Sequence, residues 1–266
     1  MSVDEFSDNT TKNDWTQFTD VAAKNPEKVQ EMRDLMFGEF ARYQVLPLDA
    51  SAATRFAAPR PSMAAGRTVF NYSGTTVTNI PAGNMPSLMN TSYTITAEID
   101  VPKAGADGMI VNEGGRFAGY GLYLSKGRPT FTYNFFGLKR TKWQGPELTP
   151  GKHTIEFDFR YDGLGAGTLA YNNVSGVARG GTGRLKVDGK VVSTEKLEHT
   201  VGFALPLDTV FNIGAAAGSP VDDKDYQIPF KFEGTISKLT YALDRPKLTP
   251  ADVKKLEEAN RQMQQK

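Results

Sequence analysis

The chain has 266 residues, with 39% hydrophobic residues, 16 Phe and 10 Tyr, so it can bury the core of one large β domain plus a small extension. Its 31 Lys and Arg nearly balance its 30 Asp and Glu, and the net charge of +1 argues against a general binder of nucleic acid or anionic membranes, which would need a basic surplus. The absence of Cys excludes disulfides, thiolate metal sites and thiol nucleophiles.

No stretch of 18 consecutive apolar residues occurs, so we expect no membrane-spanning helix. The acidic N-terminus lacks the apolar core of an export signal. The compartment therefore stays open: cytoplasmic as the chain stands, or periplasmic if it forms part of an exported enzyme.

Residues 1–49 are predicted to form a helical extension. Asn25 is suited to cap a helix and Pro26 to occupy its first position. Apolar residues then recur at spacings of three and four and make one stripe along the helix, between residues 29 and 43. This stripe needs a partner surface, either on the rest of the chain or on a second protein.

An extended connector is expected at residues 50–66, which are rich in Ala, Pro, Arg and Ser. Residues 67–245 are then predicted to form an antiparallel β-sandwich. Residues 93–101 alternate strictly between apolar and polar side chains, as in a strand with one buried face. Asp188 and Gly189 separate two further alternating runs, which is the strongest short-range signal for a hairpin.

Two later segments complete the chain. Seven glycines fall between residues 163 and 183, but they lack the Gly-Lys-Ser/Thr that a phosphate-binding loop needs, so a mobile loop is predicted. A C-terminal helix is predicted within residues 246–266, with Thr249 as its cap and Pro250 at its first position.

Several short motifs, taken in order, resemble the C-terminal region of long bacterial arylsulfatases. The resemblance extends along nearly the whole chain, and its motifs lie at residues 14–28, 43–49, 60–62, 66–68, 92–97, 157–163, 211–214, 218–221 and 229–236. The resemblance implies an all-β fold, a concanavalin A-like (laminin G-like) jelly roll preceded by one helix. It also implies a partner, namely a sulfatase catalytic domain or subunit.

The residues that a sulfatase uses for catalysis are missing. The family's formylglycine arises from Cys or Ser in a Cys/Ser-x-Pro-x-Arg motif, whereas here Ser62 follows Pro61 and no Arg comes behind it. Asn212, Ala215 and Ala216 stand where relatives carry carboxylates, so a cation that relatives hold there would be lost. The resemblance therefore predicts the accessory part of such an enzyme without its catalytic part.

Glu98 and Asp100 are candidate ligand-binding carboxylates. Residues i and i+2 of a strand face the same side about 6.6–6.8 Å apart, near the separation of paired glycosidase carboxylates. The third carboxylate of the endoglucanase pattern is absent, because position 101 is Val and position 103 is Lys. The plainer interpretation is an ordinary polar strand face.

A sugar-binding platform is the second candidate site, formed by Tyr123, Arg140 and Trp143. Aromatic rings pack on pyranose faces, and Arg reaches hydroxyls or sulfate. Trp143 stands out because it lies in an otherwise polar run. The alternative is an aromatic side chain that packs under a loop.

Asp222, Asp223 and Asp225 could ligate Ca²⁺, but Lys224 interrupts them and no Gly-centred calcium loop is present, so a solvated acidic turn is the simpler interpretation. We expect no metal and no cofactor. The sequence thus predicts a non-catalytic accessory or docking module, with a carbohydrate-binding module for glycans or sulfated glycans as the alternative.

Overall fold

The computed structural model describes residues 18, 20–48, 63–64, 66–74, 76–163, 178–202, 211–244, 249–251, 254, 258 and 261. The chain divides into two compact units, residues 1–60 and 61–266, each of which is considered by itself. Most of the predicted connector lies outside the described residues. The predicted domain boundaries stay predictions.

The first unit contains the predicted helix. A 3-10 turn, η1 (Ala22–Lys24), leads into α1 (Pro26–Arg42), and none of the side chains of α1 is buried within this unit. Pro26 opens the helix as predicted. The side chain of Asn25 does not cap it, because its Nδ2 donates instead to the Val21 carbonyl (3.0 Å).

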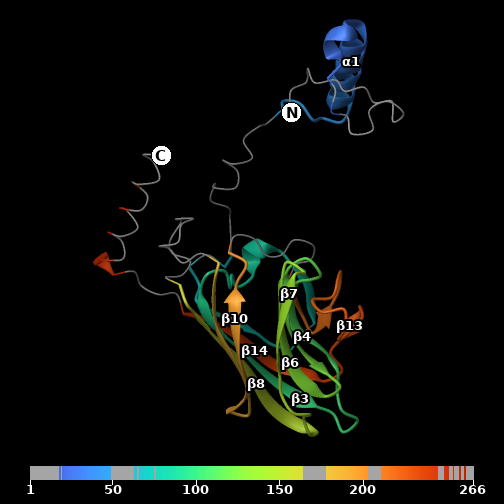
Figure 1. Ribbon diagram of the computed structural model, residues 1–266. Coiled ribbons are helices and arrows are strands. Elements are labelled where there is room, and N and C mark those ends of the chain that lie inside the picture. The colour runs from blue at the N-terminus through green and yellow to red at the C-terminus, as the bar shows by residue number, and fades with distance from the viewer. Residues whose placement is uncertain are drawn as a thin grey trace. The chain divides into compact units, whose positions relative to one another are not determined.

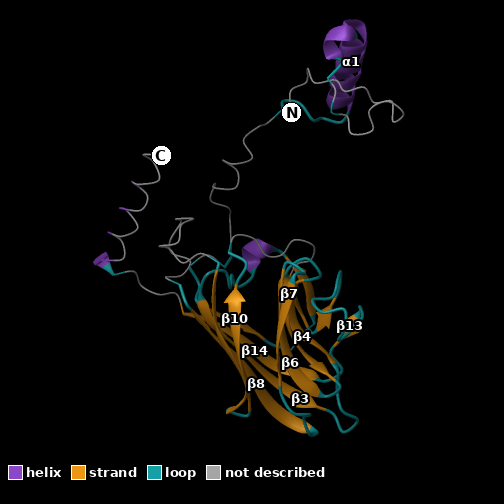
Figure 2. Ribbon diagram, viewed as in Figure 1, coloured by secondary structure: helices purple, strands orange, loops and turns teal. Residues whose placement is uncertain are grey.

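The second unit is a sandwich of two mainly antiparallel sheets, which Figure 2 shows as two layers of strands. The first sheet has six strands, in the order β1 (Val69–Tyr72), β14 (Thr235–Asp244), β3 (Ser92–Val101), β8 (Gly151–Tyr161), β9 (Arg179–Val187) and β10 (Lys190–His199). The predicted two-layer antiparallel architecture is confirmed.

The second sheet has eight strands. Six lie in the order β12 (Ala215–Ala216), β13 (Phe230–Lys231), β4 (Gly108–Gly114), β5 (Gly119–Ser125), β6 (Arg128–Phe135) and β7 (Lys139–Gln144). Two more join at the side, since β11 (Phe211–Ile213) pairs with both β4 and β2 (Val77–Ile80). A second 3-10 turn, η2 (Ala82–Asn84), follows β2.

The core lies between the two sheets. Along β3 the apolar residues are buried and the polar ones face outward, as the alternation predicts. Phe131 of β6 stacks on Phe157 of β8 across the interface, with ring centroids 3.5 Å apart. The hairpin predicted around Asp188 and Gly189 is present as β9 and β10.

The glycine-rich segment corrects one prediction. Residues 164–177 lie outside the described residues, but residues 179–183 belong to strand β9 and not to a mobile loop. A Cβ at Gly183 would lie 2.7 Å from the Trp143 ring and 2.8 Å from the Phe157 ring. Glycine is needed here because two large aromatic side chains pack against the bare backbone.

The predicted C-terminal helix is not supported. Most of residues 246–266 lie outside the described residues, and the α-helix among the described elements is α1 (Figure 1). Within the described part of the chain, no helix is both long and apolar enough to cross a membrane.

Candidate functional site

The predicted sugar platform does not exist as a surface. Tyr123 and Trp143 are fully buried. Trp143 points between the sheets, where its indole N–H donates to the Gly183 carbonyl (2.9 Å). Sequence reasoning placed Trp143 outside the core because its neighbours are polar. In a strand, however, polar neighbours in sequence lie on the opposite face.

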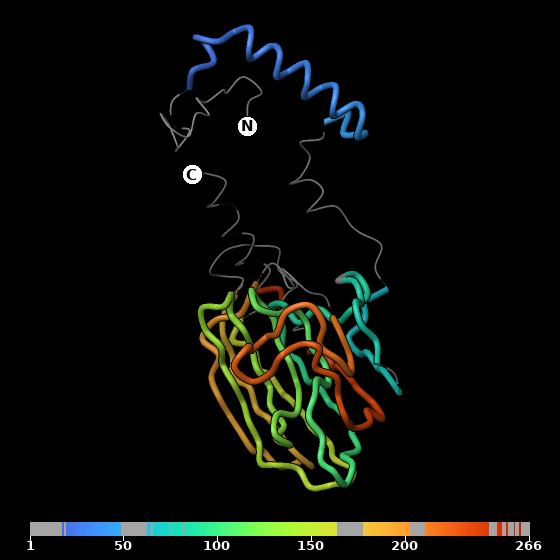
Figure 3. The backbone as a smooth tube through the Cα atoms, turned by 90° about the vertical axis from the view of Figure 1, so that its right-hand side faces the viewer, coloured from blue at the N-terminus to red at the C-terminus, as the bar shows by residue number. Residues whose placement is uncertain are grey.

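Chain segment 217–229, which joins β12 to β13, covers part of the outer face of the eight-stranded sheet. In Figure 3 this orange segment passes in front of the green strands. Ala216 and Tyr226 pack on Met109 and Tyr123, with Phe230 beside them, and form a small second core. The sheet face on which a ligand was expected is therefore occupied by the protein's own chain.

Lys142 fastens this covering segment. Its ammonium group lies 3.0 Å from a carboxylate oxygen of Asp222 and 2.7 Å from one of Asp225. The Tyr123 hydroxyl also donates to Asp225 (2.5 Å), and Arg140 Nε donates to the Val221 carbonyl (2.9 Å). We call Tyr123, Lys142, Asp222 and Asp225 the acidic clamp.

The ionisation of the clamp follows from these contacts. Burial lowers the pKa of Lys142, but the hydrogen bonds to Asp225 and Asp222 raise it by more, so the pKa is raised overall. Burial, together with the bond to Asp225, raises the pKa of Tyr123 far above its usual value. Lys142 therefore stays cationic and Tyr123 stays neutral across ordinary pH.

The same contacts account for the three aspartates that were metal candidates. Asp222 and Asp225 face Lys142, and Asp223 lies 3.7 Å from Arg140. Among the described residues no group of three or more His, Asp or Glu side chains could hold a metal ion. The turn is not simply solvated, because Asp222 is buried and paired.

Glu98 and Asp100 lie together on the outer face of the six-stranded sheet. Glu98 stands opposite Lys238, and Asp100 stands opposite Thr235. Neither carboxylate forms an ion pair or a side-chain hydrogen bond within the described part of the chain. Asp100 of β3 pairs with Thr235, the first residue of β14. The hollows described next lie at that end of the sheet.

A shallow hollow of about 650 Å³ opens beside the turn that joins β13 to β14. Its lining residues are Asp107, Pro229, Phe230, Lys231, Phe232, Glu233 and Gly234. Phe230 is half-buried, and its ring is fixed by stacking on Tyr226, with centroids 4.6 Å apart. The aromatic side chain of Phe230, two carboxylates and the ammonium group of Lys231 thus meet at one surface, which we call the turn hollow.

Hydrogen bonds hold both carboxylates of the turn hollow in place. Asp107 Oδ1 accepts from the Gly127 backbone N–H (2.8 Å), and Glu233 Oε2 accepts from the Asp107 backbone N–H (3.0 Å). The Glu233 N–H in turn donates to the Asp107 carbonyl (2.9 Å). Within the described residues, the other oxygen of each carboxylate has no hydrogen-bond partner.

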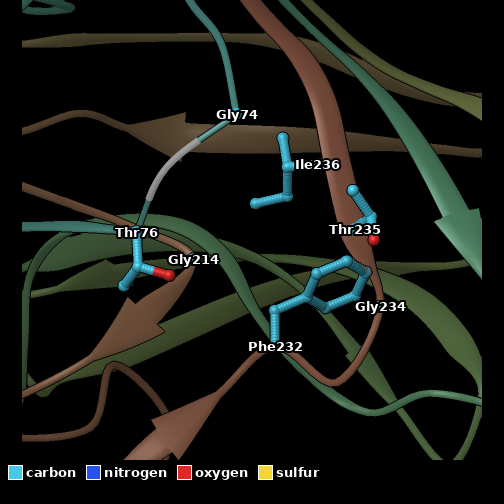
Figure 4. A pocket seen from close by; sticks show the side chains of 7 residues that line it. All are labelled: Gly74, Thr76, Gly214, Phe232, Gly234, Thr235 and Ile236. Atoms are coloured by element: carbon cyan, nitrogen blue, oxygen red, sulfur yellow. The ribbon is translucent and has the colours of Figure 1, made fainter.

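A second, smaller pocket of about 130 Å³ adjoins the turn hollow, since both are lined by Phe232 and Gly234. Figure 4 shows the described residues that line it, which are Gly74, Thr76, Gly214, Phe232, Gly234, Thr235 and Ile236. Phe232 and Ile236 supply apolar surface, and Thr76 and Thr235 supply hydroxyl groups. We call it the rim pocket.

Asp107, Phe230 and Glu233 were missed by the sequence analysis. Glu233 and Phe230 lie in a motif that was used only for a family resemblance. Asp107 precedes Gly108 in an Asp-Gly pair, which is typical of a turn but does not indicate a binding site.

One further carboxyl is buried away from these sites. Glu113 of β4 lies in the interior, and burial raises its pKa to about 8, against a lowering by a hydrogen bond from Tyr120. Its Oε2 has no hydrogen-bond partner among the described residues. Glu113 is therefore protonated at neutral pH.

The comparisons with known proteins do not show a family to which the chain belongs. No family model matches the chain, and no curated protein matches it. Among solved structures it is similar to the CBM40 of the Ruminococcus gnavus IT-sialidase bound to α2,3 sialyllactose, with 12% identity, a TM-score of 0.43, and coverage of 69% of this chain and 95% of that chain.

Two other solved structures show a similar degree of likeness. Domains LG4-5 of the mouse laminin α1 chain share 14% identity (TM-score 0.41; 71% of this chain and 46% of that chain). The botulinum neurotoxin serotype D binding domain shares 12% identity (TM-score 0.41; 72% and 43%). At these scores the likeness bears on neither ligand nor role, and nothing in the comparisons supports an arylsulfatase origin.

Proposed function

We propose that the sandwich is a glycan-binding module and that its ligand lies in the turn hollow. The observation that carries the proposal is the pair of unused carboxylate oxygens on Asp107 and Glu233, held next to Phe230 in a hollow of about 650 Å³. This volume lies within the range of about 300–1,000 Å³ that is typical of small-ligand sites.

The chemistry of the hollow suits a sugar. A pyranose ring presents an apolar C–H face, which packs on an aromatic ring, and a hydroxyl edge, which donates to carboxylates. Phe230 can take the first role, and Asp107 with Glu233 the second. Hydrogen bonds already fix both carboxylates, so little side-chain entropy is lost when a ligand binds.

Glu98 and Asp100 belong to this proposal as neighbours of the site. Asp100 pairs in register with Thr235 at the start of β14, directly after the turn. A glycan longer than one residue would meet these carboxylates next. The accessory role beside a sulfatase catalytic domain is not included, because no comparison favours it.

The test is a glycan array followed by titration calorimetry on the full chain. We expect binding to at least one array glycan. We also expect the double variant D107N/E233Q to bind it at least about tenfold more weakly, since a hydrogen bond to a charged group contributes about 1.5–3 kcal/mol. Asn and Gln keep the oxygens that accept from Gly127 and Asp107, so the fold should survive.

E195Q is the matched control, because Glu195 is an exposed carboxylate on edge strand β10, outside the hollow. It should bind like the parent chain. Failure to bind any glycan on the array, or equal losses in D107N/E233Q and E195Q, would refute the proposal.

A further inference from the structure

We propose that the rim pocket holds the acetamido group of an N-acetylated sugar, so that the glycan in the turn hollow contains an N-acetylhexosamine. This inference rests on the proposed function and names the class of sugar. It depends on the size of the pocket, the chemistry of its lining, and its position next to the hollow (Figure 4).

Size limits what the pocket can hold. A cavity of about 150 Å³ accommodates one benzene molecule. The rim pocket, at about 130 Å³, is slightly smaller, so it takes a substituent and not a whole hydroxylated sugar ring. An acetamido group is smaller than benzene and fits within that volume.

The lining combines apolar and hydrogen-bonding groups. Phe232 and Ile236 both pack with the core and offer a surface for a methyl group. Thr235 is exposed at the start of β14, and the Thr76 hydroxyl lies beside Gly214, where an added Cβ would stand 3.0 Å from its oxygen. A methyl group and an amide are the two parts of an acetamido group, whereas a bare hydroxyl would have no contact with the apolar side chains of the lining.

The pocket also selects against charge. No Lys, Arg or His occurs among the described residues that line it, so a sulfate or carboxylate that lost hydration there would not meet a cation from them. This argues against the sulfated glycans that the sequence analysis admitted.

Two glycines of the lining cannot be replaced without backbone strain or a clash. Gly74 lies at φ +69°, a conformation that suits glycine. At Gly234 a Cβ would come within 2.6 Å of the Asp100 carbonyl oxygen and 2.9 Å of the Phe232 ring. Because Gly234 and Phe232 line both hollows, a sugar ring in the turn hollow can direct a substituent into the rim pocket.

The decisive experiment compares two trisaccharides with the same linkage, N,N′,N″-triacetylchitotriose and cellotriose, which differ at each C2 by an acetamido group in place of a hydroxyl. Titrated into the full chain, the acetylated trisaccharide should bind at least tenfold more tightly. The double variant T76V/T235V removes both hydroxyls while keeping the side-chain shape, and it should erase most of that preference. T154V, an exposed Thr-to-Val change on β8, should leave the preference intact.

The outcomes separate the two proposals. Equal binding of the two trisaccharides, or tighter binding of any sulfated glycan on the array, overturns the acetamido inference and leaves glycan binding standing. Binding of no array glycan overturns both. Should T76V/T235V fail to fold in a thermal melt, the comparison of the two trisaccharides on the parent chain still decides the matter.

Discussion

The acidic clamp and the turn hollow contain the same kinds of groups, namely an aromatic ring, carboxylates and a lysine, yet they behave in opposite ways. In the clamp, Lys142 sits between Asp222 and Asp225, and the Tyr123 hydroxyl adds a further bond. In the turn hollow, Asp107 and Glu233 each keep one oxygen without a partner in the described residues. Groups that are paired within the chain hold it in place, whereas carboxylate oxygens that face solvent can exchange water for the hydroxyls of a ligand.

Glu113 is the limiting case of this comparison, because its carboxyl has neither a cation nor solvent. The pKa of Glu113 is about 8 in the folded chain, against an ordinary value of 4.5, so protonated Glu113 stabilises the folded state fully below about pH 4.5. This stabilisation is lost as the pH rises through about 8, and the free energy of unfolding should fall by about 4 kcal/mol between pH 4.5 and pH 8. E113Q cannot titrate and should not show this fall, which urea titrations at several pH values would measure.

The control for this prediction is E195Q, which alters an exposed carboxylate and should keep the pH profile of the parent chain. A parent chain whose free energy of unfolding stays flat between pH 5 and 9 would show that Glu113 is charged or solvated in the folded state.

Removing the cation of the clamp should have the next largest effect. K142M leaves Asp222 buried without its partner, and we expect the free energy of unfolding to fall by about 2–3 kcal/mol at pH 7, since Lys142 is itself partly exposed. K139M on the same strand breaks an exposed pair with Glu198 and should cost less than about 1 kcal/mol. Equal losses in the two variants, by thermal or urea unfolding, would mean that the clamp is no more than a surface ion pair.

The smallest effect on stability is expected in the turn hollow, where Asp107 and Glu233 form no ion pair among the described residues. D107N/E233Q should change the free energy of unfolding by less than about 1 kcal/mol, because each amide retains the oxygen that accepts a backbone N–H. Together with the expected loss of glycan binding, this would separate a ligand site from a structural one. A loss of stability as large as that of K142M would mean that Asp107 and Glu233, like the acidic clamp, have a structural role.

Much of the fold could be predicted from the sequence. Alternation of side chains is a local property, so β3 and the hairpin around residues 188–189 followed directly from it. Residues 179–183 were misassigned because glycine is common in loops. Here it is required by Trp143 and Phe157, which lie far away in sequence and pack against that backbone.

The candidate site was harder to predict, for a related reason. Lys142 and Asp222 are 80 positions apart, and their pairing depends on segment 217–229 folding back over the eight-stranded sheet. Asp107 and Glu233 meet in the same non-local way. Composition and spacing identified acidic and aromatic residues. Only the three-dimensional arrangement shows which of them are paired within the chain and which have oxygens that a ligand could bind.

The burial of Trp143 has a practical consequence. Its indole is shielded from water and hydrogen-bonded across the two sheets, so its fluorescence should be blue-shifted in the native chain and should move to longer wavelength when the sheets part. The chain has two Trp, and the other is Trp15. A W15F chain would therefore carry one native optical reporter, located at the interface whose opening defines unfolding of the sandwich.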